Sequence, residues 1–276
     1  MNRYHRQGTG AYLGRGVILL LYAVPLVWVL ATSLKSEGAV LTDPSGLRFT
    51  PTLEQYSNLL PTIWPSVLNS AQIAVGTVAL TLGLAVPAAY GLARRRTPGW
   101  TKAVAVLLGA FILLQMVPQP MTLMPLYRIL AGWGLTNTII GLVVVNSAFM
   151  LPFAIVLLRP FFQSIPSDLE EAAALEGASL WRTFRSVILP LASNGVITVG
   201  VMVFMLAWGE FLYGTTFLTE PDAYPVGALL VLQTSLYGTQ WGRLMALSVL
   251  ISLPILVVFL FAQRRLLEGM LSGAIK

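Results

Sequence analysis

Long apolar segments that are almost free of charge dominate this sequence and limit it to a membrane-embedded fold. Only 10% of the residues are charged and 56% are hydrophobic, whereas soluble domains carry about 25% charged residues. So few charges cannot cover a water-facing surface, and lipid must therefore be the main solvent. A helix needs about 20 apolar residues to cross the hydrocarbon core, and a barrel would show short alternating segments instead. We therefore expect an all-α membrane protein.

We predict six spans within a single domain that covers residues 1–276. The spans are Leu13–Leu34, Val67–Ala93, Ala103–Leu126, Thr138–Leu158, Asn194–Leu218 and Leu244–Ala262. With this number of spans, most Lys and Arg residues between them and at the termini fall on one side. The positive-inside rule then predicts a multi-pass protein with cytoplasmic N- and C-termini. The first span also fits a cleaved signal peptide, but its apolar run exceeds the usual length of about 7–15 residues, so we interpret it as an anchor.

Prolines mark two departures from simple spans. The outer loop, residues 35–66, contains Pro44, Pro51, Pro61 and Pro65, which predict turns and irregular structure. The third span is interrupted by three further prolines, Pro118, Pro120 and Pro125. Because proline removes a backbone donor and kinks a helix, we expect this span to be broken and to lie against protein or a water-lined cavity.

A polar insert, residues 163–192, stands out between the apolar spans. Ser167 and Glu170 have the spacing of a capping box, and Gly177 is suited to the left-handed conformation that ends a helix. A second amphipathic stretch follows, and Pro190 marks its predicted end; its apolar residues are Leu180, Trp181, Phe184, Val187 and Ile188. Two interpretations fit this helix–turn–helix: a docking element for another protein, or a connector that rests on the bilayer.

One motif in the insert has a specific spacing. Glu171-Ala172-Ala173 is followed after three residues by Gly177 and, after nine more, by Val187 with Leu189-Pro190. This pattern resembles the EAA loop of ABC importer permeases, with Val187 in place of the usual Ile. Further matches extend the resemblance along nearly the whole chain, toward the sugar-importer branch and its maltose-type second permease. They include Ala88-Ala89-Tyr90, Gly134-Leu135 with Asn137-Thr138, Trp241-Gly242 and Gly273-Ala274-Ile275-Lys276.

The resemblance implies a type I ABC importer permease fold in a prokaryotic inner membrane, with residues 163–192 as the cytoplasmic coupling loop. It implies import of a carbohydrate or related polar solute by alternating access. The implied partners are a second permease in a heterodimer, two ATPase subunits that hold ATP and Mg, and an extracytoplasmic binding protein. The ATPase-coupling residues would be Glu170, Glu171, Ala172, Ala173, Gly177, Leu189 and Pro190. The C-terminal Ser272, Gly273 and Lys276 would also reach the ATPase subunits.

Polar side chains inside spans are candidates for the translocation pathway because their burial in lipid is costly. The candidates are Gln115, Asn146, Trp208 and Glu210. Glu210 is the acid that we place inside a span, and the aromatic faces of Trp208 and Tyr213 suit sugar rings. The alternative for each polar residue is a hydrogen bond between helices. The chain departs from the family pattern at Gly209, where Asn is usual, and at Val144-Val145-Asn146, where a proline is common.

Other function classes lack their required residues. The sequence has no G-x-x-x-x-G-K-[ST] phosphate loop, no cysteine and one histidine, His5, so we expect no ATPase, catalytic, cofactor or metal site on this chain. We attribute the net charge of +6 to Lys and Arg residues that orient the protein in the membrane, not to nucleic-acid binding. An ion-coupled secondary transporter usually shows intramembrane ionisable residues and internal repeats. An ion-coupled secondary transporter and a non-sugar ABC permease are the alternatives to a sugar-importing ABC permease.

Overall fold

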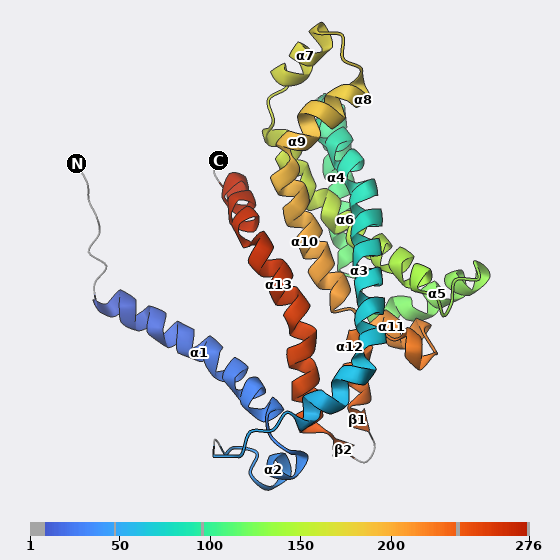
Figure 1. Ribbon diagram of the computed structural model, residues 1–276. Coiled ribbons are helices and arrows are strands. Elements are labelled where there is room, and N and C mark those ends of the chain that lie inside the picture. Colours follow the sequence, from blue (N-terminus) through green and yellow to red (C-terminus); the bar gives the residue numbers. More distant parts are fainter. Residues whose placement is uncertain (1–8, 47, 95–96, 236–237, 275–276) are drawn as a thin grey trace. The chain divides into compact units, whose positions relative to one another are not determined.

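The computed structural model describes residues 9–46, 48–94, 97–235 and 238–274, and most of them are helical (Figure 1). The described strands form a short antiparallel hairpin of β1 (Thr234–Ser235) and β2 (Gly238–Thr239), in which Thr234 pairs with Thr239. The chain forms two compact units. One comprises Met1–Trp64 with Leu230–Leu253, and the other comprises Pro65–Leu229 with Pro254–Lys276.

The first unit joins helix α1 (Thr9–Ser33), the short helix α2 (Glu37–Thr42) and the beginning of α3 (Glu54–Arg94). It also holds the hairpin and the beginning of α13 (Trp241–Ala274). The Thr52 amide donates to the Leu34 carbonyl at 2.8 Å, and the Ser33 and Tyr56 hydroxyls lie 2.7 Å apart. The end of α1 is therefore tied to the start of α3.

The prediction of turns and irregular structure in residues 35–66 is confirmed for the described residues between Asp43 and Leu53 and was wrong for the helical parts of the loop. The segment contains α2, and α3 already begins at Glu54, so Pro61 and Pro65 lie within a helix. The physical reason is the burial pattern. Gln55, Leu59 and Ile63 are buried at intervals of four residues, and this helical stripe packs one face of α3 against the unit.

The second unit is built around α3, α6 (Ile139–Ser164) and α10 (Ser193–Trp208). Its main core includes Ala85 and Ala89 of α3, Leu158 and Phe162 of α6, and Val203 of α10. The remaining elements of this unit surround these helices or close its ends. They include α4 (Pro98–Gln115), α5 (Gln119–Gly132), α7 (Asp168–Leu175), α8 (Leu180–Thr183), the π-helix η1 (Phe184–Ile188), α9 (Leu189–Leu191), α11 (Leu212–Phe217), the 3-10 turn η2 (Pro221–Ala223) and most of α12 (Val226–Leu232).

Five described helices are long and apolar enough to cross a membrane, namely α1, α3, α4, α6 and α13. A sixth span results if Leu180–Leu191 and Ser193–Trp208, which meet at a bend of 73°, are counted together. The predicted third span is broken as expected, because α4 ends at Gln115 and α5 begins at Gln119, beside Pro118. The predicted fifth span is shorter than expected: α10 ends at Trp208, and a turn precedes α11.

Candidate functional site

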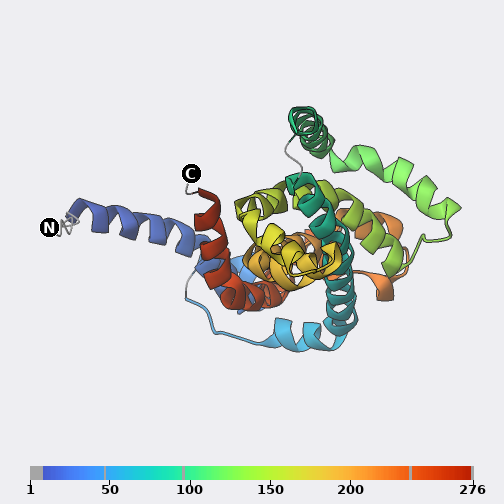
Figure 2. The ribbon, with the colours of Figure 1, turned by 90° about the horizontal axis from the view of Figure 1, so that it is seen from above.

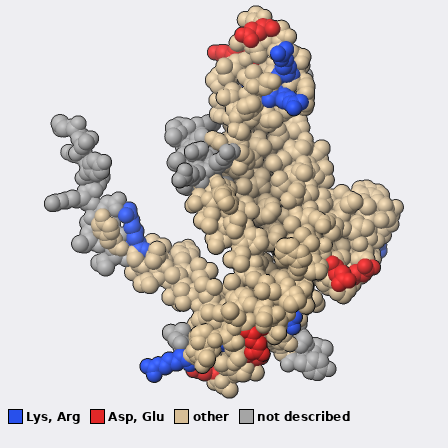
Figure 3. All heavy atoms as spheres, viewed as in Figure 1, with Lys and Arg blue, Asp and Glu red and all other residues tan. Residues whose placement is uncertain are grey.

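Helix α7 lies at the end of the bundle formed by α3, α6 and α10, as Figures 1 and 2 show together. None of its residues is buried. Three acids, Asp168, Glu170 and Glu171, occupy its first turn, where the positive end of the helix dipole favours them. Figure 3 shows acidic and basic side chains gathered over this end of the molecule. The helix is thus presented to solvent rather than packed into the bundle.

The predicted capping box does not form. Ser167 has helical dihedral angles, φ −64° and ψ −27°, and its side chain makes no capping hydrogen bond. Its backbone carbonyl instead accepts from the amides of Glu170 at 2.9 Å and Glu171 at 3.2 Å. The carboxylate of Glu170 is occupied elsewhere, because it forms an ion pair with Arg94.

The predicted turn at Gly177 is confirmed. Gly177 has φ +79°, its amide donates to the Ala174 carbonyl at 3.0 Å, and the Ala178 amide donates to Ala173 at 3.0 Å. This pair of bonds is a Schellman motif, which uses a left-handed residue to satisfy the last carbonyls of a helix. An added Cβ would meet no atom within 4 Å, so the backbone conformation is what favours glycine here.

The second part of the insert begins where Ser179 accepts a hydrogen bond from the Arg182 amide at 3.3 Å. This part ends at Leu191, the residue after the predicted end at Pro190. The Leu189 amide donates to Phe184, five residues back, and this π-turn places Pro190 in the first turn of α9, where its missing N–H is tolerated. Phe184 and Ile188 are buried, but Leu180 is 88% exposed.

Exposed apolar side chains flank the turn between α7 and α8. Leu175 is 90% exposed, and Trp181 on α8 is also well exposed. Leu180, at the start of α8, is exposed as well, while the acidic first turn lies at the other end of α7. A protein surface with both apolar and acidic groups is typical of a site for another protein.

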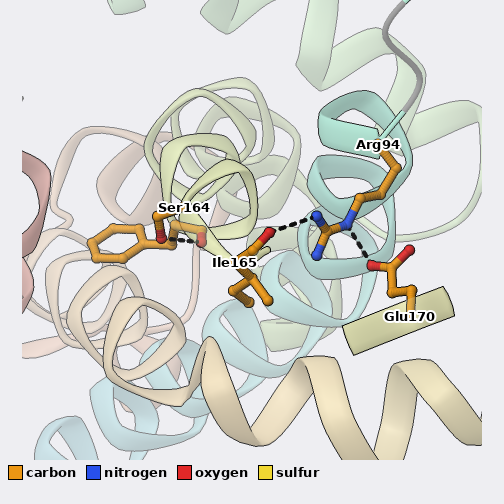
Figure 4. A network of polar contacts seen from close by, with 5 residues as sticks. Arg94, Ser164, Ile165 and Glu170 are labelled. Atoms are coloured by element: carbon orange, nitrogen blue, oxygen red, sulfur yellow. Dashed lines mark hydrogen bonds and ion pairs between the residues drawn. The ribbon is translucent and has the colours of Figure 1, made fainter. Parts of the chain in front are cut away.

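Arg94, at the end of α3, connects the insert to the bundle (Figure 4). Its Nε lies 2.6 Å from Oε1 of Glu170, and its Nη1 donates to the Ile165 carbonyl at 2.9 Å. The guanidinium also lies over the ring of Tyr90, 5.5 Å from its centroid. By the positive-inside rule Arg94 is one of several charges that orient the spans, and the sequence pattern did not predict this role. Its position at the end of an apolar span that is predicted to reach the same side of the membrane as the acidic first turn of the insert was the available signal.

The four pathway candidates have different surroundings, and the described contacts do not bring them into one site. Gln115 is exposed, donates to the Phe149 carbonyl at 2.7 Å, and lines a cavity of about 260 Å³. Asn146 is buried, and its Nδ2 has no hydrogen-bond partner among the described residues. Trp208 is buried and stacks on Phe204, with ring centroids 5.8 Å apart.

Glu210 has a structural role in this conformation. Its two carboxylate oxygens accept from the amides of Tyr213 at 2.6 Å and Gly214 at 3.0 Å, and so cap α11. Tyr213 is fully buried, and its hydroxyl lies 2.9 Å from Oγ1 of Thr122. Because protein covers the rings of Trp208 and Tyr213, neither presents a face to a sugar here.

The C-terminal candidates are only partly described. Ser272 and Gly273 lie on the helical backbone of α13, and Lys276 lies outside the described residues.

Comparison with known proteins identifies the family. Residues 85–271, which include the entire insert, match the model for the binding-protein-dependent transport system inner membrane component. The chain belongs to this permease family. It is 34% identical over 257 residues to the trehalose transport system permease protein SugB of Mycobacterium tuberculosis, covering 92% of each chain. It is 33% identical to the diacetylchitobiose uptake system permease protein NgcG of Streptomyces coelicolor, covering 93% of this chain and 85% of that one.

The fold of the permease also matches solved structures. A chain of a bacterial ABC transporter involved in the import of the acidic polysaccharide alginate superposes with a TM-score of 0.76. The superposition covers 96% of this chain and 99% of the other, at 21% identity. This likeness, together with the family match, makes the chain a multi-pass permease subunit of an ABC importer, which is a transporter rather than an enzyme.

Proposed function

We propose that this permease carries a sugar or related polar solute into a prokaryotic cell as one of two different transmembrane subunits. Relatives named for trehalose and diacetylchitobiose uptake support a carbohydrate as the cargo. The distribution of basic residues supports cytoplasmic termini and a cytoplasmic insert. An extracytoplasmic binding protein would deliver the solute, and a solved bacterial alginate ABC transporter in complex with an alginate pentasaccharide-bound periplasmic protein supports this part of the proposal.

The motor in this proposal is a pair of ATPase subunits, each of which would hold ATP and Mg²⁺. The observation that carries it is the geometry of α7, a helix with no buried residue that ends in a left-handed glycine beside exposed Leu175, Leu180 and Trp181. We assign Glu171, which is exposed, and Ala172 and Ala173, whose small side chains permit close approach, to the docking face. Leu189 and Pro190 support the following turn, and Ser272, Gly273 and Lys276 form a second contact with the motor.

A second permease would cover part of the apolar surface that this chain leaves exposed. Val104 is the one buried residue of α4, and Leu108 and Phe111 pack partly against the core. The exposed apolar residues of that helix, such as Val106, Ile112 and Leu113, would face lipid or another subunit. In this assembly, closure of the ATPase subunits on ATP would pull the two insert helices together. The spans would then alternate between inward- and outward-open states, and Gln115 is the pathway candidate whose side chain is already exposed.

The experiment compares Gly177→Pro with Gly134→Pro in the tagged complex purified from native membranes. The two glycines are well matched, because both have positive φ, +79° and +68°, and neither has an atom within 4 Å of an added Cβ. Each amide also donates to a carbonyl three residues back. Proline fixes φ near −65° and removes that donor, so both variants should lose similar stability.

We expect the Gly177 variant to insert normally into the membrane. The amount of the ATP-hydrolysing subunits that co-purify with it should fall at least about tenfold, because a misdirected α7 loses its docking geometry. The Gly134 variant should recover them as the wild type does. Equal recovery in both variants would contradict docking through α7. Uptake of trehalose or diacetylchitobiose that survives ATP depletion but stops with a proton uncoupler would favour the ion-coupled alternative.

A further inference from the structure

Two neighbouring glutamates in the first turn of α7 face different surroundings. Glu171 is exposed, whereas the side chain of Glu170 is 24% exposed and paired with Arg94. Among the described residues this is the one ion pair in the chain. In this EAA-type insert, Glu171 is therefore available to a partner protein, whereas Glu170 faces the helix bundle of its own chain.

The pair is the side-chain anchor of an otherwise loosely attached helix. No residue of α7 is buried, and its ends lead into short linkers at Ile165–Ser167 and Glu176–Ser179. Burial of apolar surface therefore contributes little to holding α7 in one orientation. The contact between Glu170 and Arg94 is what defines that orientation relative to α3.

Arg94 also reaches the helix that precedes the insert. Its Nη1 donates to the carbonyl of Ile165, the C-cap residue that follows α6, while Nε faces Glu170. A second arginine strengthens the same junction, because Nε of Arg159 on α6 donates to the Leu92 carbonyl at 3.3 Å. The ends of α3 and α6 are thereby joined at the point where α7 is held.

Behind the junction lies the main core. Tyr90, under the Arg94 guanidinium, contacts Phe162 of α6 and Phe184 of η1, with ring centroids 5.8 Å and 5.0 Å apart. Phe162 and Phe184 belong to the buried cluster that α3, α6 and α10 share. Because packed interiors have low compressibility and transmit strain, we expect a displacement of Arg94 to reach these helices.

We propose that Arg94 and Glu170 form an intramolecular latch through which movement of α7 reaches α3 and α6. This inference rests on the proposed function and deepens it: Glu171 belongs to the motor-facing surface, and Glu170 is a positioning residue that acts through Arg94. The planar guanidinium suits this task, since it can engage a carboxylate and a carbonyl at the same time in fixed directions. A lysine would offer a single ammonium group on a flexible stem.

The test is hydrogen–deuterium exchange on the complete complex, purified from native membranes and compared without nucleotide and with ATP plus vanadate. In the wild type, ATP with vanadate should change exchange both in α7 and in the last turns of α3, residues 85–94. Glu170→Gln keeps the size of the side chain but removes its charge. We expect the ATP-driven change in α3 to shrink roughly three- to tenfold, while α7 exchanges faster without nucleotide.

The matched control is Glu176→Gln, which removes the same charge from an exposed residue at the other end of α7. It should behave as the wild type does. Arg94→Lys keeps the charge, and its ATP-driven change should fall between the values for the wild type and Glu170→Gln. Recovery of the ATPase subunits should be the same in all these complexes, because none of the changes replaces Glu171, Ala172 or Ala173, which we assign to the docking face.

The outcomes separate the latch from the function on which it rests. If ATP and vanadate leave exchange in the wild type unchanged, the proposed ATP-driven mechanism is wrong. If the wild type responds and Glu170→Gln responds to the same extent, the permease is ATP-driven but the latch is not its route. If Glu176→Gln loses the response as strongly as Glu170→Gln, the effect is one of charge near the docking face, and the latch is again overturned.

Discussion

Arg94 and Lys35 are both basic side chains withdrawn from solvent, but they hold different kinds of structure. Lys35 is 2% exposed, and its Nζ donates to the carbonyls of Asp43 at 3.1 Å and Pro44 at 3.2 Å. Its ammonium also lies near the rings of Trp28 and Phe49, at 5.9 Å and 5.2 Å from their centroids. Arg94, in the other unit, donates to a carbonyl 71 residues away.

The difference in sequence separation indicates a difference in role. Lys35 closes its own loop, because both acceptors lie within nine residues of it. Arg94 joins α3, the end of α6 and α7, which are remote in sequence and are proposed to move together. A local anchor should therefore determine the stability of a segment, while a long-range anchor should determine how movement passes between helices.

The largest stability effect is expected for Lys35→Met. Methionine retains an apolar stem of similar length but leaves two carbonyls without their donor and removes the cation–π contacts. Loss of a charged hydrogen bond and of those contacts should lower the free energy of unfolding by about 2–3 kcal/mol. Thermal unfolding of the purified complex measures the loss, and hydrogen exchange should locate it in residues 34–53.

Arg48→Met is the control for this prediction, because Arg48 belongs to the same segment but is exposed. It should change stability by less than about 0.5 kcal/mol. The contrast between local and long-range anchors would break down if Lys35→Met left stability unchanged. It would also break down if that variant suppressed the ATP-driven exchange in α3 as Glu170→Gln is expected to do.

The sequence was sufficient to predict the helical fold because its signals were strong and local. Apolar segments located the long helices, Pro118 located the break between α4 and α5, and Gly177 located the turn after α7. The start of α3 was misplaced because Pro61 and Pro65 are strong local signals for irregular structure. The segment is helical nonetheless, because its buried stripe of Gln55, Leu59 and Ile63 packs against the unit. Sequence patterns indicate such tertiary burial only weakly.

The site was predicted in outline but not in its contacts. Spacing alone suggested that Ser167 and Glu170 cap each other, but it could not show that Arg94 competes for the same carboxylate from 76 positions away (170 − 94). Similarly, the intramembrane position assigned to Glu210 indicated function, whereas its partners are amides three and four residues along the chain. The roles of Glu170 and Glu210 depend on which partners the folded chain brings next to them, and residue spacing alone does not predict those partners.

Glu210→Gln tests whether this acid is a local anchor of the same kind as Lys35. Glutamine retains one acceptor oxygen but places an NH₂ group against a backbone amide at the start of α11. The loss should be about 1–2 kcal/mol of unfolding free energy, with no change in uptake per ATP hydrolysed. Thermal unfolding and reconstituted uptake measure the two quantities, and exposed Glu220→Gln is the control. Altered uptake at unchanged stability would instead support a place in the pathway.

Tyr213→Phe should produce the smallest effect on stability. It tests whether a neutral long-range contact behaves like the charged long-range contact of Arg94. The lost contact joins α11 to Thr122 of α5, yet the ring stays packed on Phe149 and Phe217, with centroids 5.6 Å and 5.3 Å away. Thr122 also keeps its hydrogen bond to the Gln119 carbonyl at 2.6 Å. The substitution removes one neutral hydrogen bond, between the Tyr213 and Thr122 hydroxyls, while the Gln119 carbonyl keeps its donor. We therefore expect the free energy of unfolding to fall by about 0.5–1 kcal/mol.

The more exposed Tyr127→Phe, which removes the same hydroxyl from a nearby residue of α5, is the control for Tyr213→Phe in thermal unfolding of the complex. A reduced ATP-driven exchange response in α3 without a loss of stability would show that neutral contacts also carry the movement. In that case sequence separation, rather than charge, would be the property that distinguishes Arg94 from Lys35. An unchanged response would restrict transmission to the charged junction at the end of α3.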